Sequence, residues 1–154
     1  MALQTSITQF QRPGARGLIA KAEARNIISR SLAVGAAAVL FGVPVYRGAT
    51  DDLCSGLVAA GDFLGLSRMS GVVDPASAGD RYLPGDEIPI MMEGVMWVET
   101  GAAVVAGTPA GYNPATGLFG AVGAPYAAVL GIEFDTATSA AGLAIVRLVR
   151  TVPA

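Results

Sequence analysis

The chain has 154 residues, enough for one domain with a sizeable core, and its 10 basic and 12 acidic residues give a net charge of −2. It contains no histidine and one cysteine, Cys54. These counts exclude serine–histidine and cysteine–histidine catalysis, zinc held by histidine or by several thiolates of one chain, and an intrachain disulfide.

Residues 1–30 have few apolar side chains, a Pro13-Gly14 break and no apolar stripe at helical spacing. We therefore expect an extended N-terminal arm at 1–30, with at most one short helix, and a body at 31–154. No apolar run lies before the first basic residues, so no signal peptide is expected, and no stretch reaches the ~20 apolar residues that cross a bilayer. The protein is expected to be made and used inside a cell, or in something assembled there.

Charge is distributed unevenly along the chain. Residues 1–50 hold six basic residues and one acidic residue, a net charge of +5, whereas residues 51–146 hold two basic and eleven acidic residues, a net charge of −9. This asymmetry indicates that the two parts meet different surroundings, although a solvated arm is the plain alternative. The basic residues that we consider candidates for a protein interface are Arg12, Arg16, Lys21, Arg25 and Arg30.

From residue 33 onward, short Val, Ile, Leu and Ala runs alternate with Gly and Pro, which is typical of an all-β domain with many turns. The first strand is predicted at 39–47, with a bend at 42–44, and the next at 63–68. A helix is possible only around residues 53–60. Turn residues dominate 72–86, so this segment is predicted to be a loop.

Residues 85–100, GDEIPIMMEGVMWVET, are predicted to form a hairpin in which Ile88, Ile90 and Met92 define the buried face and Glu93-Gly94 the turn. Pro89 lacks an N–H donor, which indicates an edge strand with one side free for a neighbouring subunit. Trp97, on the predicted return strand, is either a core residue or an anchor of a protein interface.

Several further short strands are predicted between residue 103 and the final apolar run, GLAIVRLV, which is apolar on both faces as in a central strand. The total of roughly eight to ten strands with intervening turns predicts an all-β fold, either a jelly-roll-like sandwich or a small β-barrel with an extended N-terminal arm.

The carboxylates of the predicted hairpin lie too far apart to act together in acid–base catalysis. Asp86 and Glu87 are neighbours and point to opposite faces, while Glu87 and Glu93 would lie ~20 Å apart, beyond the separation of about 5–9.5 Å used by paired catalytic carboxylates. Neither acidic cluster follows a regular calcium loop, and no phosphate-binding glycine motif is present. We expect no catalytic residue, metal or cofactor.

Nucleic acid and membrane are not expected partners. The basic arm lacks aromatic side chains other than Phe10, and the acidic body would repel a phosphate backbone.

The order of segments resembles the structural cement or head-decoration proteins of tailed bacteriophages. The likeness rests on the joint order of FQRPGARG, FGVPVYRG, FLGLSRM, YLPGDEIPIMMEGVMWVET, AVVAGTPAGYNPATGLFG and GIEFDTATSAAGLAIVRL, and it covers nearly the whole chain. It implies a non-enzymatic virion protein on the outer capsid surface, made in the host cytoplasm. It further implies that the protein clamps neighbouring major capsid protein subunits and acts as a dimer or trimer at local symmetry axes.

Other functions remain open at this point. The alternatives are a phage tail or baseplate component, a β-rich oligomer unrelated to phage, and a metal- or sugar-binding module. The basic arm would pair with acidic groups on the shell, and the predicted free strand edge at Pro89 would accept a strand from a partner.

Overall fold

The computed structural model of the chain describes residues 14–57, 62–70 and 81–149. Within these ranges all regular elements are β-strands, which confirms the all-β prediction. No helix that could span a membrane occurs in this described part of the chain. The strands are β1 (Asn26–Leu32), β2 (Val39–Leu40), β3 (Pro44–Arg47), β4 (Leu53–Ser55), β5 (Phe63–Ser67), β6 (Arg81–Tyr82), β7 (Glu87–Thr100), β8 (Pro109–Asn113), β9 (Leu118–Ala121), β10 (Ala127–Phe134) and β11 (Gly142–Leu148).

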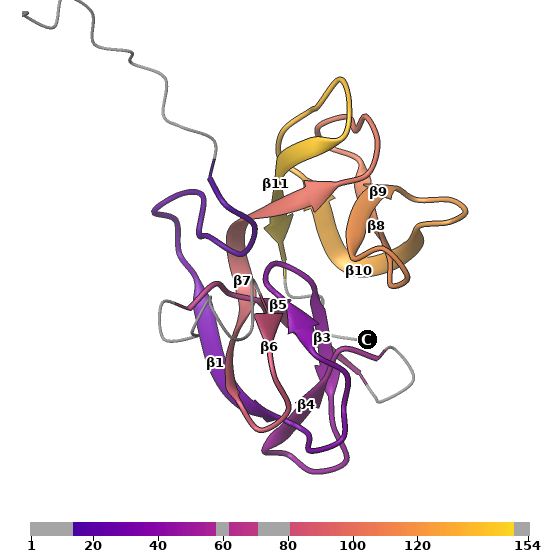
Figure 1. Ribbon diagram of the computed structural model, residues 1–154. Helices are drawn as coiled ribbons and strands as arrows, with labels where there is room; N and C mark the ends of the chain where they lie inside the picture. Colours follow the sequence, from indigo (N-terminus) through magenta and orange to yellow (C-terminus); the bar gives the residue numbers. More distant parts are fainter. Residues whose placement is uncertain (1–13, 58–61, 71–80, 150–154) are drawn as a thin grey trace, which may run out of the picture.

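The long strand β7 is shared by two closed rings of strands. One ring runs β1-β4-β3-β5-β7 and closes because β1 also pairs with β7, and the other runs β7-β11-β10-β8-β9 and closes where Thr100 of β7 pairs with Phe119 of β9. We name them the N-terminal barrel and the C-terminal barrel. Figure 1 shows β7 passing from the lower, N-terminal barrel into the upper, C-terminal barrel. Of the two predicted architectures, the small barrel is therefore the one found.

The predicted hairpin at residues 85–100 is wrong, because this segment is one continuous strand. Its first half pairs with β1 as far as Glu93, and its second half pairs with β11 from Gly94 onward. Gly94 has a φ of 132°, a conformation that favours glycine. The glycine does not reverse the chain; it lies where the strand passes from one barrel to the other.

The buried face of β7 also differs from the prediction by one residue. Ile88 and Ile90 are fully buried as expected, but Met91 is fully buried and Met92 is only half-buried. The pairing register with β1 shifts between Asn26↔Glu93 and Ile27↔Met91, so one extra residue is accommodated in β7. Such a bulge moves the following side chains to the opposite face, which a strict period of two does not anticipate.

Other predicted strands are confirmed with small changes. The segment 39–47 forms β2 and β3 with the bend between them, and 63–68 forms β5. The final apolar run forms β11, which lies between β7 and β10 as a central strand should. Residues 53–55 form β4 rather than the start of a helix, while 58–60 lie outside the described residues.

The body begins before the expected boundary at residue 30. β1 starts at Asn26 and is paired with β7 as far as Ser31. Preceding it, residues 14–25 also lie against the body, and we name them the strap (Figure 1). Residues 1–13 of the expected arm lie outside the described residues.

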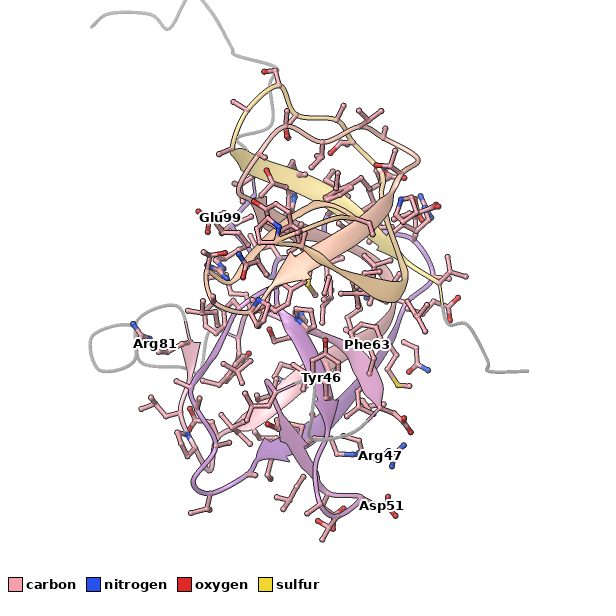
Figure 2. All side chains as sticks on the ribbon, turned by 90° about the vertical axis from the view of Figure 1, so that its right-hand side faces the viewer. Tyr46, Arg47, Asp51, Phe63, Arg81 and Glu99 are labelled. Carbon is pink, nitrogen blue, oxygen red and sulfur yellow. The ribbon has the colours of Figure 1, made fainter. Side chains whose placement is uncertain are left out.

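One apolar core cluster extends through both barrels. Aromatic pairs fill it at several points, with ring centroids 5.1 Å apart for Phe41 and Tyr82 and 5.1 Å apart for Tyr112 and Phe119. The rings of Tyr46 and Phe63, labelled in Figure 2, form a further edge-to-face pair at 5.9 Å on the N-terminal barrel.

Candidate functional site

The carboxylates of β7 do not converge on one point. Glu87, Glu93 and Glu99 are spaced six residues apart along a single strand, and Glu99 accepts a hydrogen bond from Arg16 at 3.1 Å. Within the described ranges, no group of three or more Asp, Glu, Cys or His side chains is placed to hold a metal ion. The features that remain are the surfaces that could meet another protein.

The strap runs alongside the second half of β7 as an irregular additional strand. The Gly17 N–H donates to the Trp97 carbonyl at 2.8 Å, and the Trp97 N–H donates to the Leu18 carbonyl at 2.9 Å. The Ala20 N–H then donates to the Val95 carbonyl at 2.9 Å. β11 pairs with one edge of this half of β7, and the bonds from the strap satisfy backbone N–H and C=O groups on the opposite edge.

Arg16 joins the strap to both barrels. Its Nε donates to the Phe41 carbonyl at 2.8 Å, its Nη1 to Glu99 Oε2 at 3.1 Å, and its Nη2 contacts the Gly117 carbonyl at 3.4 Å. The side chain is only 16% exposed. The planar guanidinium suits this role because it presents several fixed donors at once. Arg16 is therefore engaged within the chain.

A second charged cluster holds the strap against β10 and β11. Arg147 donates to Glu23 at 2.6 and 3.2 Å and to Asp135 at 3.0 Å, and Lys21 donates to the other oxygen of Asp135. The hydrogen bond from Lys21, assisted by Arg147, lowers the pKa of Asp135 below its ordinary value of 3.8. The hydrogen bond from Arg147 likewise lowers the pKa of Glu23. Lys21, expected at a protein interface, is thus used in an internal ion pair.

The other basic candidates are placed differently. Arg25 is exposed and forms no hydrogen bond or ion pair with the described residues. Arg30 is half-buried on β1, and its Nη1 donates to the Ser29 carbonyl at 2.9 Å, while its Nε is buried without a partner. Arg12 lies outside the described residues. The four described candidates, Arg16, Lys21, Arg25 and Arg30, thus have different surroundings, with two held in ion pairs, one exposed and one half-buried on β1.

Pro89 is not at a free sheet edge, so that prediction is wrong. β1 pairs on one side, with Ser29 opposite Pro89, and on the other side the Arg68 N–H donates to the Pro89 carbonyl at 2.8 Å. In a regular antiparallel pair the residue at position 89 would also donate its backbone N–H to the Arg68 carbonyl, but proline has no N–H. The Tyr82 hydroxyl donates to that carbonyl instead. Burial raises the pKa of Tyr82 to about 12, so the hydroxyl keeps its proton for this bond. The missing donor is compensated from within the fold.

Trp97 is half-buried on β7, where it pairs with Ile145 of β11. A Cβ added to Gly14 would lie 2.3 Å from Trp97 Cδ1, so the start of the strap covers the indole and leaves no room for a side chain. The described part of the chain therefore already provides Trp97 with a packing partner.

The C-terminal barrel presents a surface without charge that the sequence interpretation missed. No charged residue occurs between Glu99 and Glu133, a segment that includes β8, β9 and most of β10. The loop after β9 projects from this barrel (Figure 1), and we name the exposed side chains of residues 121–130 the apolar ridge. Its largest members are Val122, 48% exposed, and Leu130, 78% exposed. The absence of charged residues from this segment is visible in the amino-acid sequence itself and could have indicated this surface.

The base of the apolar ridge is fixed by Tyr126. The Tyr126 ring lies against the α-carbon of Gly120, where an added Cβ would come within 2.6 Å of the ring. The Tyr126 hydroxyl lies against the α-carbon of Gly101, where an added Cβ would come within 2.5 Å of the hydroxyl oxygen. Gly123 and Tyr126 also exchange backbone hydrogen bonds of 3.0 and 2.5 Å across the turn. Only glycine allows such a close approach of an aromatic side chain to the backbone.

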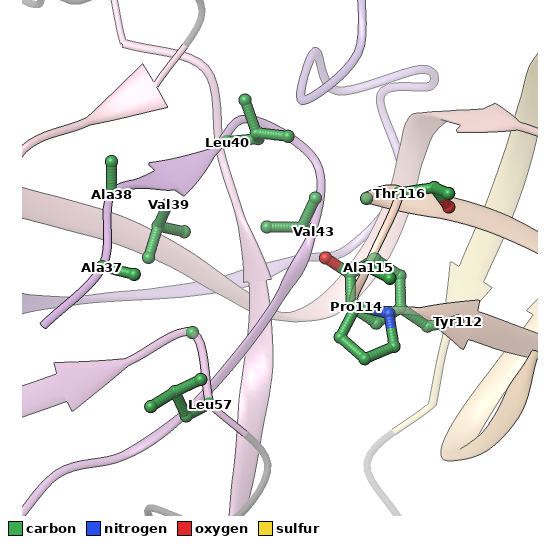
Figure 3. A pocket seen from close by; sticks show the side chains of 12 residues that line it. Ala37, Ala38, Val39, Leu40, Val43, Leu57, Tyr112, Pro114, Ala115 and Thr116 are labelled. Carbon is green, nitrogen blue, oxygen red and sulfur yellow. The ribbon is translucent and has the colours of Figure 1, made fainter.

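An uncharged pocket of about 220 Å³ lies between the two barrels, and Figure 3 shows its lining. Val39, Val43 and Leu57 contribute from the N-terminal side, and Tyr112 and Pro114 from the C-terminal side. Its lining contains no acidic, basic or thiol side chain. Tyr112 is the one ionisable side chain of this lining, and burial raises the pKa of its hydroxyl to about 12.

A family model and a solved structure are similar to this chain. The family model described as "Structural cement protein (E217 gp24/Pam3 gp6)" matches residues 3–149. A chain in the solved structure "The capsid of Myoviridae Phage XM1" is similar at a TM-score of 0.69 and 16% sequence identity, over 96% of this chain and 97% of that one. At this identity the likeness speaks for the fold. No curated protein matches the sequence.

Proposed function

The chain belongs to the family of phage structural cement proteins and is a structural protein of a capsid, and we propose that it binds the outer surface of the shell. There it stabilises contacts between neighbouring major capsid protein subunits, without catalysing a reaction. We further propose that it acts as a dimer or trimer at local symmetry axes.

The observation that carries this proposal is the extent of the family match. Residues 3–149 include the strap, both barrels and the shared strand β7, so the whole described fold belongs to the matched unit. The described surface is compatible with a role in binding, because Arg16 and Arg147 are held in ion pairs within the chain and neither the pocket nor the ridge carries a charged side chain.

The test is binding of the full-length chain to capsids assembled without it. We expect the protein to co-sediment with these capsids and to raise the temperature at which they break apart, because a ligand that binds only the assembled state stabilises that state. Unassembled capsid subunits serve as the control. Capsids that neither bind the protein nor gain thermal resistance would refute the proposal.

Deleting residues 1–30 is not a suitable test of the arm. That deletion removes the strap and most of β1, a strand that closes the N-terminal barrel, so it would disturb the fold as well as any contact with the shell. Deleting residues 2–12 keeps the described fold from Gly14 onward and isolates the contribution of the remaining arm, including Arg12. Unchanged binding of this variant would exclude these residues from the contact.

A further inference from the structure

The two barrels differ in where they carry charge. The N-terminal side exposes charged side chains that Figure 2 labels, such as Arg47 and Asp51 on the N-terminal barrel and Arg81 on β6, which pairs with β2. On the C-terminal barrel, Glu99, Asp135 and Arg147 are engaged with the strap, and Glu133 near the end of β10 is exposed. The surface of residues 100–132 has no charged residue.

This division is informative because protein surfaces that remain in water normally carry interspersed charges, whereas the centres of protein interfaces are depleted of them. Covering a charged side chain is costly unless it is paired, and covering Val122, Leu130 and their alanine neighbours involves no such cost. The apolar ridge therefore has the composition of a surface that another protein covers.

The ridge is also held in one shape before any partner arrives. Tyr126 packs into the space left by Gly101, Gly111 and Gly120, on the segment before β8 and on β8 and β9, and this fixes the loop that carries Val122. A preorganised loop loses little conformational freedom on binding, so more of the contact energy appears as affinity.

Building on the proposed function, we propose that the apolar ridge of the C-terminal barrel is the shell-facing surface and that the charged N-terminal barrel faces solvent. The partner is an uncharged, apolar patch on the outer face of the major capsid protein. An uncharged patch fits this surface, since a charged patch placed on the ridge would lose its hydration and receive no counter-charge.

The test compares two matched substitutions in the full-length chain, Leu130→Glu on the ridge and Val34→Glu on the N-terminal side. Both side chains are largely exposed, at 78% and 91%, so neither substitution should change the melting temperature of the free protein. In co-sedimentation with capsids, Leu130→Glu should weaken binding by at least about tenfold, and Val34→Glu should stay within about twofold of wild type. Val122→Glu replaces Leu130→Glu if the latter lowers the melting temperature.

Salt dependence supplies a second readout. Binding through an uncharged surface should change by no more than about twofold between about 0.1 and 0.5 M NaCl, because there are no ion pairs to screen. A steep loss of binding with salt would overturn the assignment in favour of the basic residues of the arm and strap.

Three other outcomes would also overturn it. Binding that survives Leu130→Glu and is lost with Val34→Glu would reverse the orientation. A change in the sedimentation coefficient of the free protein caused by Leu130→Glu would assign the ridge to contact with a second copy. Absence of wild-type binding would refute the proposed function itself, and this result is distinct from a loss confined to the ridge variants.

Discussion

Replacing Arg16 with alanine tests how the strap is attached to the barrels. The substitution removes a charged hydrogen bond of 2.8 Å to the Phe41 carbonyl, worth about 1.5–3 kcal/mol, and a partly exposed ion pair with Glu99, worth about 0.2–1 kcal/mol. The 3.4 Å contact with the Gly117 carbonyl adds little. We expect the free energy of unfolding to fall by about 2–4 kcal/mol, or roughly 5–15 °C in melting temperature for a chain of this size.

The assay is urea unfolding followed by circular dichroism and by the fluorescence of Trp97, the one tryptophan of the chain. Because Gly14 of the strap covers the indole, detachment of the strap exposes Trp97 to water and shifts its emission to longer wavelength. Arg47→Ala is the matched control, since its ion pair with Asp51 is solvent-exposed and worth about 0.2–1 kcal/mol. Equal losses of stability in the two variants would refute the role of Arg16 as a clasp.

Three further predictions concern single positions. Gly94→Ala should lower the free energy of unfolding by about 1–3 kcal/mol, because alanine is strained at a φ of 132°, whereas Gly142→Ala, with open space at its Cβ position, should change it by less than about 0.5 kcal/mol in the same urea assay. The lowered pKa of Asp135 means that its ion pairs contribute stability that is complete above the ordinary value of 3.8 and is lost as the pH falls through the lower folded pKa. Asp135→Asn should therefore flatten the melting temperature profile between roughly pH 5 and pH 2, and an unchanged acid slope would contradict this assignment. Cys54 is fully buried and burial raises the pKa of its thiol to about 11, so a thiol reagent at pH 8 should label it only as fast as the chain unfolds; rapid labelling of the folded protein would disprove its burial.

The sequence was sufficient to predict fold class because that depends on local patterns. Short apolar runs separated by Gly and Pro predicted strands at 39–47 and 63–68 and a central strand at the C-terminal end, and the structure has β2, β3, β5 and β11 there. These elements follow from turn chemistry and from a period of two, which neighbouring residues alone determine.

The course of β7 was not predictable by the same means. Glu93-Gly94 has the composition of a two-residue hairpin turn, and local chemistry alone does not distinguish a turn from a glycine inside a long bent strand. The outcome depends on the partners, β1 before Gly94 and β11 after it, which are remote in sequence. Pro89 illustrates the same limit, since the donor that compensates for it is the hydroxyl of Tyr82 on a different strand.

The candidate interface residues show what composition leaves undetermined. The basic excess of the first fifty residues indicated contact with acidic groups, and the structure shows such contact for Arg16 and Lys21, but within the chain. A count of charges does not separate internal from external counter-charges, because both satisfy the same electrostatics. The charge-free segment 100–132 is the more specific signal, since no internal partner can account for an exposed Leu130.

The sharing of β7 predicts that the two barrels unfold together. Without β7, each ring retains four strands and an open side that exposes its core. A cavity made in one barrel should therefore destabilise both. Leu66→Ala in the N-terminal barrel and Phe119→Ala in the C-terminal barrel each remove a fully buried side chain and should cost about 2–5 kcal/mol. For both variants, the fluorescence of Trp97 and the circular dichroism should report one coincident, shifted transition. If Leu66→Ala shifted the circular dichroism but left the Trp97 transition in place, the barrels would be independent units and β7 would not couple them.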